Sequence, residues 1–183
     1  MVASDGTWSV TPTQALANGT AQVSVTATDP AGNVSPATLV PVTIDTTAPT
    51  APVADVAAES DNGASNTDNL TNDTTPTLRG TGSAGDTITV TLPTGEVLTT
   101  VVASDGSWSV TPTQALPSGV ASVSVTATHA AGNTSPASTV DLTIDTSAPA
   151  APTVNTALTS DTTPVLRGTA SVQPGETLTV TVN

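Results

Sequence analysis

The chain of 183 residues is acidic and poor in large side chains, with 15 Asp and Glu against 2 Lys and Arg, a formal net charge of -13, and no Cys, Phe or Tyr. The lack of cysteine excludes a cysteine nucleophile and a thiolate metal site, and the one His leaves only His129 for a serine–histidine pair. A chain with this much negative charge cannot neutralise a phosphate backbone or an anionic membrane. We therefore expect no nucleic acid or membrane partner.

Short runs of alternating apolar and polar residues, rich in Val, Ile and Thr, follow one another along the chain. Clusters of Gly, Pro, Asn and Asp separate them. Alternation with period 2 predicts β-strands, and no segment has the apolar period of 3.6 residues that a helix needs. The expected strands cover residues 52–57, 77–81, 87–92, 96–102, 108–111, 120–128 and 139–144. About seven antiparallel strands in about 100 residues are typical of an immunoglobulin-like β-sandwich, so we predict an all-β fold.

The sequence repeats itself. Residues 2–52 align with residues 102–152 at an offset of 100, and 37 of the 51 positions are identical. A second block, residues 73–81, recurs as residues 161–169. The acidic stretch that precedes this block is 12 residues shorter in the later copy, and because its flanks keep their sequence we expect it to be a loop.

Each copy of the longer block carries one tryptophan, Trp8 or Trp108, directly after the sequence Asp-Gly-Thr or Asp-Gly-Ser. A sandwich built of Val, Leu, Ile and Ala needs a bulky side chain to fill its middle, and a buried aromatic ring contributes 150–250 Å² of buried area. We therefore expect both tryptophans in the core. The alternative is that they are exposed and bind a ligand.

Four motifs together resemble the tandem bacterial Ig-like repeats of giant surface adhesins and biofilm-associated proteins. They are the linker at residues 44–49, the strand at residues 73–81, the turn at residues 105–108 and the loop at residues 27–33. The resemblance implies an extracellular protein of the bacterial surface, exported by type I secretion. It also implies a stiff, non-catalytic stalk with calcium bound at the junctions between repeats.

The family's boundary motif, Asp-Thr-Thr/Ser-Ala-Pro, divides the chain into three parts. We expect residues 1–44 to be the C-terminal half of one repeat, residues 45–144 a complete repeat, and residues 145–183 the N-terminal part of a third. The two partial repeats together lack only the counterparts of about residues 94–101. We therefore expect them to pair, either head-to-tail between molecules or within one molecule.

The acidic loop at residues 59–73 carries four acids and four Asn in 15 residues. Calcium prefers oxygen ligands of this kind, although the spacing is not that of an EF-hand, and a merely solvated loop is the alternative. In an Ig-like sandwich this loop faces the linker that follows the last strand. The expected ligands of the tighter junction site are Asp61, Asp68, Asp73 and Asp145.

The junction before the complete repeat offers Asp45, Asp86 and His129, which occupies the position of Asp29 in the first copy. Asp29 and Asp45 are the other expected calcium ligands. Neutral histidine is a poor ligand for a hard cation, so we expect this site to be weaker. Alternatively, Asp45 and Asp145 only cap the turns that begin each linker.

Three functions remain open. A calcium-stiffened structural stalk explains the repeats, the acidity and the lack of a catalytic set. A recognition module that binds carbohydrate or protein through its loops would be favoured by exposed aromatic residues. An ancillary domain of a surface hydrolase would need a catalytic domain, and this sequence shows none.

Overall fold

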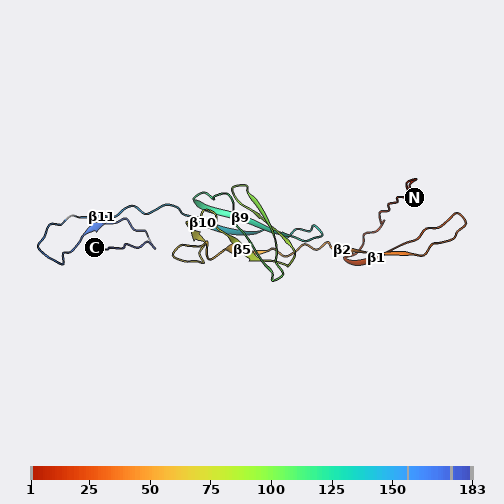
Figure 1. The fold of residues 1–183 in the computed structure, drawn as a ribbon, viewed down its shortest axis with the longest axis horizontal. Coiled ribbons are helices and arrows are strands. Elements are labelled where there is room, and N and C mark those ends of the chain that lie inside the picture. Colours follow the sequence, from red (N-terminus) through yellow and green to blue (C-terminus); the bar gives the residue numbers. More distant parts are fainter. Residues whose placement is uncertain (1, 156, 174, 182–183) are drawn as a thin grey trace.

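The computed structural model describes residues 2–155, 157–173 and 175–181 (Figure 1). Over these residues the chain is all-β, as predicted, and no helix long and apolar enough to cross a membrane occurs among them. The strands are β1 (Gly19–Val25), β2 (Thr38–Ile44), β3 (Val53–Val56), β4 (Leu70–Thr71), β5 (Leu78–Thr81), β6 (Thr87–Thr91), β7 (Val97–Val101), β8 (Ser107–Val110), β9 (Gly119–Thr128), β10 (Ser138–Ile144), β11 (Thr153–Val154) and β12 (Gly168–Thr169).

Residues 45–144, which we call the complete repeat, form two sheets. One has the order β3-β5-β8 and the other β4-β10-β9-β6-β7. The pairs are antiparallel except that β4 runs parallel to β10. The expected strands are all present, but β4 is an additional one: the sequence predicted only a loop there, since a two-residue strand has no readable alternation.

The core lies between the two sheets. In β9, alternate residues are buried, and Val123 and Val125 face Leu78 and Trp108 of the smaller sheet within one cluster of apolar side chains. Trp108 is 4% exposed, which confirms its predicted place in the core. The alternation predicted from the sequence is therefore the alternation of buried and exposed positions.

Gly80 allows β3 and the indole ring to approach β5 closely. A Cβ atom at Gly80 would lie 1.8 Å from the carbonyl oxygen of Val53 and 2.8 Å from Cζ2 of Trp108. Gly168 of β12 approaches its partner strand as closely, since its Cβ would lie 1.9 Å from the carbonyl oxygen of Thr153, but no tryptophan ring lies within 4 Å of it. Glycine is thus required at this strand position by packing.

The partial repeats form hairpins with the same register as their counterparts. In residues 1–44, called the first half repeat, β1 pairs with β2 so that Gly19 lies opposite Ile44, as Gly119 lies opposite Ile144. Residues 145–183, called the third segment, contain the pair β11–β12. Trp8 is 54% exposed, so its predicted core position is wrong here: the strands that cover Trp108 have no counterpart in the first half repeat.

Glu96, at the turn between β6 and β7, holds the loop that joins β8 to β9. Its Oε1 accepts hydrogen bonds from the backbone N–H (3.0 Å) and the hydroxyl of Thr113, and Oε2 accepts one from the N–H of Gln114 (3.2 Å). These bonds, the Thr113 hydroxyl above all, lower the pKa of Glu96. A carboxylate with a lowered pKa stabilises the fold only while it is ionised.

We expect Glu96→Gln to lower the melting temperature at neutral pH and to have a shrinking effect as the pH falls. The sign follows from linkage: the stabilisation is complete above the carboxyl group's pKa in the unfolded chain and is lost as the pH falls through its pKa in the folded chain. Glu59→Gln is the control, because Glu59 is exposed and forms a long ion pair, at 4.0 Å, with the equally exposed Arg79, which contributes little stability. The same pH dependence in both variants would contradict a specific role for Glu96.

Candidate metal sites at the two poles of the complete repeat

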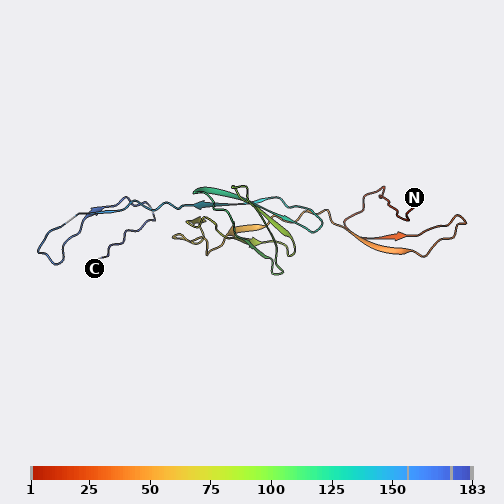
Figure 2. The ribbon, with the colours of Figure 1, turned by 45° about the horizontal axis from the view of Figure 1, so that its top comes forward.

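The chain enters and leaves the complete repeat at opposite poles (Figure 2). At the exit, the acidic loop lies against the start of the outgoing linker: the N–H of Asp145 donates to the carbonyl of Thr71 (2.9 Å), and the N–H of Thr143 to that of Asn69 (2.8 Å). The loop thus lies beside Asp145.

Asp61 is the buried acid of this loop, with 1% of its surface exposed. Its Oδ2 accepts a hydrogen bond from the N–H of Asn69 (3.2 Å), and Asn69 has a left-handed backbone with φ of 58°. Its Oδ1 is buried and has no hydrogen-bond partner. A buried carboxylate oxygen without a partner is costly, because burial removes the water that would otherwise solvate it.

A hollow of about 190 Å³ lies beside the same linker. The residues that line it are Asn62, Gly63, Leu70, Thr71, Asn72 and Asp145. Asp61 does not line this hollow, and neither do Asp68 and Asp73. Asp68 and Asp73 each cap a turn: Asp68 Oδ1 accepts from the N–H of Leu70 (3.1 Å), and Asp73 Oδ1 from that of Thr75 (2.9 Å).

At the entry pole, Asp86 is 4% exposed. Its Oδ1 lies 2.5 Å from Nδ1 of His129, and its Oδ2 is buried without a hydrogen-bond partner. Both residues line a hollow of about 460 Å³ together with Asp45 and Thr43 of the incoming chain. From the sequence we predicted only that Asp86 lies near Asp45 at this junction. Its burial was not predicted, because nothing in the residues around it distinguishes it from an exposed loop acid.

The loop that contains Asp29 closes on itself. Asp29 Oδ1 accepts from the N–H groups of Ala31 (2.9 Å) and Asn33 (2.8 Å), and Oδ2 accepts from the Asn33 side chain (2.8 Å). These bonds, that of the Asn33 side chain first, lower the pKa of Asp29. In the complete repeat, where His129 replaces the Asp, the amide of Asn133 instead donates to the carbonyl of Asp45 (2.8 Å), across the junction.

Over the described ranges, no three side chains of Asp, Glu or His gather closely enough to hold a metal ion by themselves. Asp45 and Asp145 each cap a turn, accepting from the N–H of Thr47 and Ser147, both at 2.9 Å. Each pole nevertheless combines a linker carboxylate with a buried carboxylate oxygen that lacks a partner. Carbonyls and water can complete the six to eight oxygen ligands of calcium.

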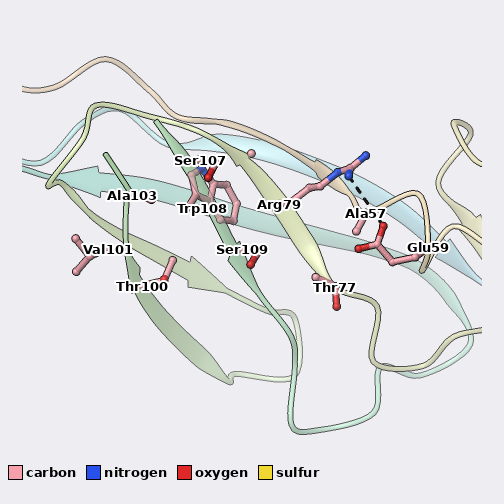
Figure 3. Close-up of a pocket in the computed structure, with 11 residues that line it drawn as sticks. Ala57, Glu59, Thr77, Arg79, Thr100, Val101, Ala103, Ser107, Trp108 and Ser109 are labelled. Atoms are coloured by element: carbon pink, nitrogen blue, oxygen red, sulfur yellow. Dashed lines mark ion pairs between the residues drawn. The ribbon is translucent and has the colours of Figure 1, made fainter. Parts of the chain in front are cut away.

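A further hollow of about 500 Å³ lies over β5, β7 and β8 and is drawn in Figure 3. Small side chains such as Thr77, Thr100 and Ser109 form much of its wall, and Arg79 reaches across it toward Glu59. Trp108 borders the hollow but is almost fully buried, so it offers no open ring face on which a sugar could stack.

Two packed sheets around a single tryptophan define the complete repeat as an immunoglobulin-like sandwich. A family model described as "Bacterial Ig-like domain" matches residues 1–46 and 47–146. The chain therefore belongs to the bacterial Ig-like domain family. Comparison with curated proteins finds no match.

Three solved structures illustrate the similarity. A Ca²⁺-stabilised adhesin that helps an Antarctic bacterium reach out and bind ice is 29% identical over 74% of this chain and 34% of that chain, with a TM-score of 0.38. A tetra-tandem repeat from the extending region of a large adhesion protein is 27% identical over 84% and 38%, with a TM-score of 0.42. The BSP domain of a biofilm-associated protein is 25% identical over 80% and 22%, with a TM-score of 0.38. This chain thus spans well under half of each, and the family assignment rests on the family model.

Proposed function

We propose that this chain is an extender segment of a bacterial surface adhesin, a structural stalk outside the cell rather than an enzyme. The observation that carries the proposal is the placement of the two linkers at opposite poles of the complete repeat (Figure 2). Repeats joined in this way add length with each copy, and the near-identity of residues 2–52 and 102–152 supports such a tandem array. The units are residues 1–44, 45–144 and 145–183, and each repeat's neighbours in the chain are its main partners.

Calcium at the junctions is the second part of the proposal. The residues present fit a calcium ion. At the entry, Asp86, whose Oδ2 is buried without a partner, lines the same hollow as Asp45. At the exit, Asp61, whose Oδ1 is buried without a partner, belongs to the loop whose Thr71 carbonyl accepts from the N–H of Asp145. Asp145 and Asp61 would hold calcium at the exit, with Asp68 and Asp73 adding charge in the same loop. Asp45 and Asp86 would hold it at the entry, and Asp29 in the matching loop of the first half repeat. Bound calcium would supply positive charge between carboxylates that otherwise repel one another.

We expect millimolar calcium to raise the melting temperature of the complete repeat after thorough chelation. A ligand that binds only the folded state stabilises it by about 2.7 kcal/mol at a hundredfold excess over Kd. Calorimetry with calcium, with magnesium and without divalent ions measures the effect. An unchanged melting temperature in calcium would rule out the metal sites and leave the structural role of the repeats standing.

The exit site is expected to be the tighter one, because His129 already occupies one oxygen of Asp86 at the entry. Asp145→Asn should therefore remove more of the calcium-induced stabilisation than Asp45→Asn. Asp145→Asn should also reduce the maximum dimension of the particle, measured by small-angle scattering in calcium, more than Asp45→Asn does, because a junction without calcium bends more freely. Asp141→Asn, which removes an exposed charge from β10, is the control. Equal losses for the two linker variants would contradict this ranking.

The partial repeats are proposed to have a further partner, a second copy of this chain that pairs with them head-to-tail. The support is the sequence alignment of these segments with the complete repeat.

A further inference from the structure

The acidic loop contains the sequence Asn62-Gly63 at the pole where the chain leaves the complete repeat (Figure 2). In such a pair the backbone nitrogen of the glycine reaches the side-chain amide carbon of the asparagine most easily, because glycine has no side chain in the way and its backbone turns freely. The other asparagines of the complete repeat, Asn66, Asn69, Asn72 and Asn133, precede Thr, Leu, Asp and Thr. Attack by a backbone nitrogen is therefore least hindered at Asn62.

The side-chain amide of Asn62 is held by two hydrogen-bond donors of its own loop. Its Oδ1 accepts from the hydroxyl of the buried Thr71 (2.9 Å) and from the N–H of Asn72 (3.3 Å). Donors at this oxygen stabilise the negative charge that develops on it when a nucleophile adds to the amide carbon. The loop thus provides the electrostatic support that this reaction needs.

The nucleophile is the backbone nitrogen of Gly63. Its N–H donates to no other backbone group of the described residues, so moving it toward Asn62 breaks no such hydrogen bond. Packing requires the glycine, because a Cβ atom there would lie 2.9 Å from the carbonyl oxygen of Leu70. The loop therefore keeps a glycine after Asn62 for a steric reason, and these groups all belong to the complete repeat.

The hollow of about 190 Å³ beside the outgoing linker, called the exit hollow, has only one charged residue in its lining, Asp145. Asn62 lines the same hollow. The affinity of a protein site for calcium depends on how many of its ligands are charged. A carboxylate at position 62 would be the second one in the exit hollow.

We propose that Asn62 deamidates spontaneously in the folded protein and that the new carboxylate strengthens calcium binding in the exit hollow. The nitrogen of Gly63 bonds to Cγ of Asn62, the bond from Cγ to the amide nitrogen breaks, and ammonia leaves with the proton of the Gly63 N–H. Water then opens the cyclic imide: its hydroxyl adds to a carbonyl carbon and its proton returns to the nitrogen of Gly63. One water is consumed, one ammonia is released, and nothing is oxidised or reduced.

The ring opens to two products. Cleavage at Cγ gives an ordinary aspartate, whose carboxylate accepts the same two hydrogen bonds from Thr71 and Asn72 and accepts them more strongly because it is charged. Cleavage at the backbone carbonyl gives isoaspartate, which adds a methylene group to the main chain between Asp61 and Gly63. The aspartate form keeps the spacing of the loop, so it is the form that we expect to tighten calcium binding.

Peptide mapping by mass spectrometry tests the modification without calcium. The full-length chain is incubated at mildly alkaline pH, where the attacking nitrogen loses its proton more readily, and then digested. We expect the amide at position 62 to be lost while Asn66 and Asn69 of the same loop keep theirs. The map also separates this site from the other Asn-Gly pair, at residues 18–19.

Two variants block the reaction in different ways. Gly63→Ala shields the amide carbon but crowds Leu70, so Asn62→Gln, whose longer side chain closes a ring less readily, is the second. Both should keep the amide. An amide at position 62 that persists as long as those of Asn66 and Asn69 in the unmodified chain would overturn the proposal.

Calcium titration by calorimetry tests the consequence, which rests on the proposed exit site. We expect Asn62→Asp to bind calcium about tenfold more tightly than Asn62→Gln, because one more carboxylate lies beside the ion. Asn66→Asp is the matched control, since it adds the same charge to the same loop outside the lining of the exit hollow. Equal gains for Asn62→Asp and Asn66→Asp would overturn the assignment to this hollow.

The two measurements separate this inference from the proposed function. If Asn62 keeps its amide while calcium raises the melting temperature, only this inference is lost. If no variant binds calcium, the proposed metal sites fail together with the effect on affinity, and the peptide map still decides whether Asn62 is modified.

Discussion

Trp108→Ala is expected to destabilise the complete repeat by about 3–5 kcal/mol, the usual cost of removing a large buried aromatic side chain. Trp108 is the largest side chain between the two sheets, and the rest of the core consists of Val, Leu, Ile and Ala. Such small neighbours cannot close the cavity left behind without moving whole strands. A loss of this size is a large fraction of the stability of a domain of about 100 residues.

Trp8→Ala is the matched control, since it makes the same change at the same position of a partial repeat. Trp8 is 54% exposed, so its removal should change the stability of the complete repeat by less than about 0.5 kcal/mol. Urea unfolding followed by far-ultraviolet circular dichroism, at a protein concentration where the chain is monomeric, measures both variants. Equal losses would show that the size of the side chain, and not its burial, decides the effect.

Gly80→Ala is expected to cost about 3 kcal/mol or more, because one methyl group cannot fit between β5 and its neighbours. Its position, 1.8 Å from the carbonyl oxygen of Val53, would force β3 away from β5. It would also press on the ring of Trp108, which limits movement in the other direction. The same urea titration, with amide hydrogen exchange to locate the loss of protection in β3, tests this expectation.

Gly82→Ala is the control for this prediction. A Cβ at Gly82 would meet only side-chain ends, Cγ2 of Val102 at 3.2 Å and Cδ1 of Ile88 at 3.6 Å, and no backbone atom. The chain itself carries Ala170 at the equivalent position of the third segment. We expect a change within about 1 kcal/mol, because the small steric cost is offset by the lower entropy of the unfolded alanine chain. A larger loss at Gly82 than at Gly80 would show that the packing around β5 is not as described.

The sequence by itself determined the fold class, the repeats and most strands. Alternation along β9 and β10 is a local property, because successive side chains of a strand point to opposite sides. The repeats are also visible without a structure, since residues 2–52 and 102–152 can be compared directly. The position of the acidic loop beside Asp145 followed from the expected order of strands in an Ig-like sandwich, and the structure places the loop there.

Only the tertiary structure decided which copies of the same residues are buried. Trp8 and Trp108 have almost the same local sequence, yet one is exposed and the other is in the core, because burial depends on strands contributed from elsewhere in the chain. The same reason applies at the poles. Asp86 meets His129 across 43 residues, and of the four acids predicted to gather at the exit only Asp145 lines the hollow there. Contacts between distant segments have no local pattern, so no sequence period could reveal them.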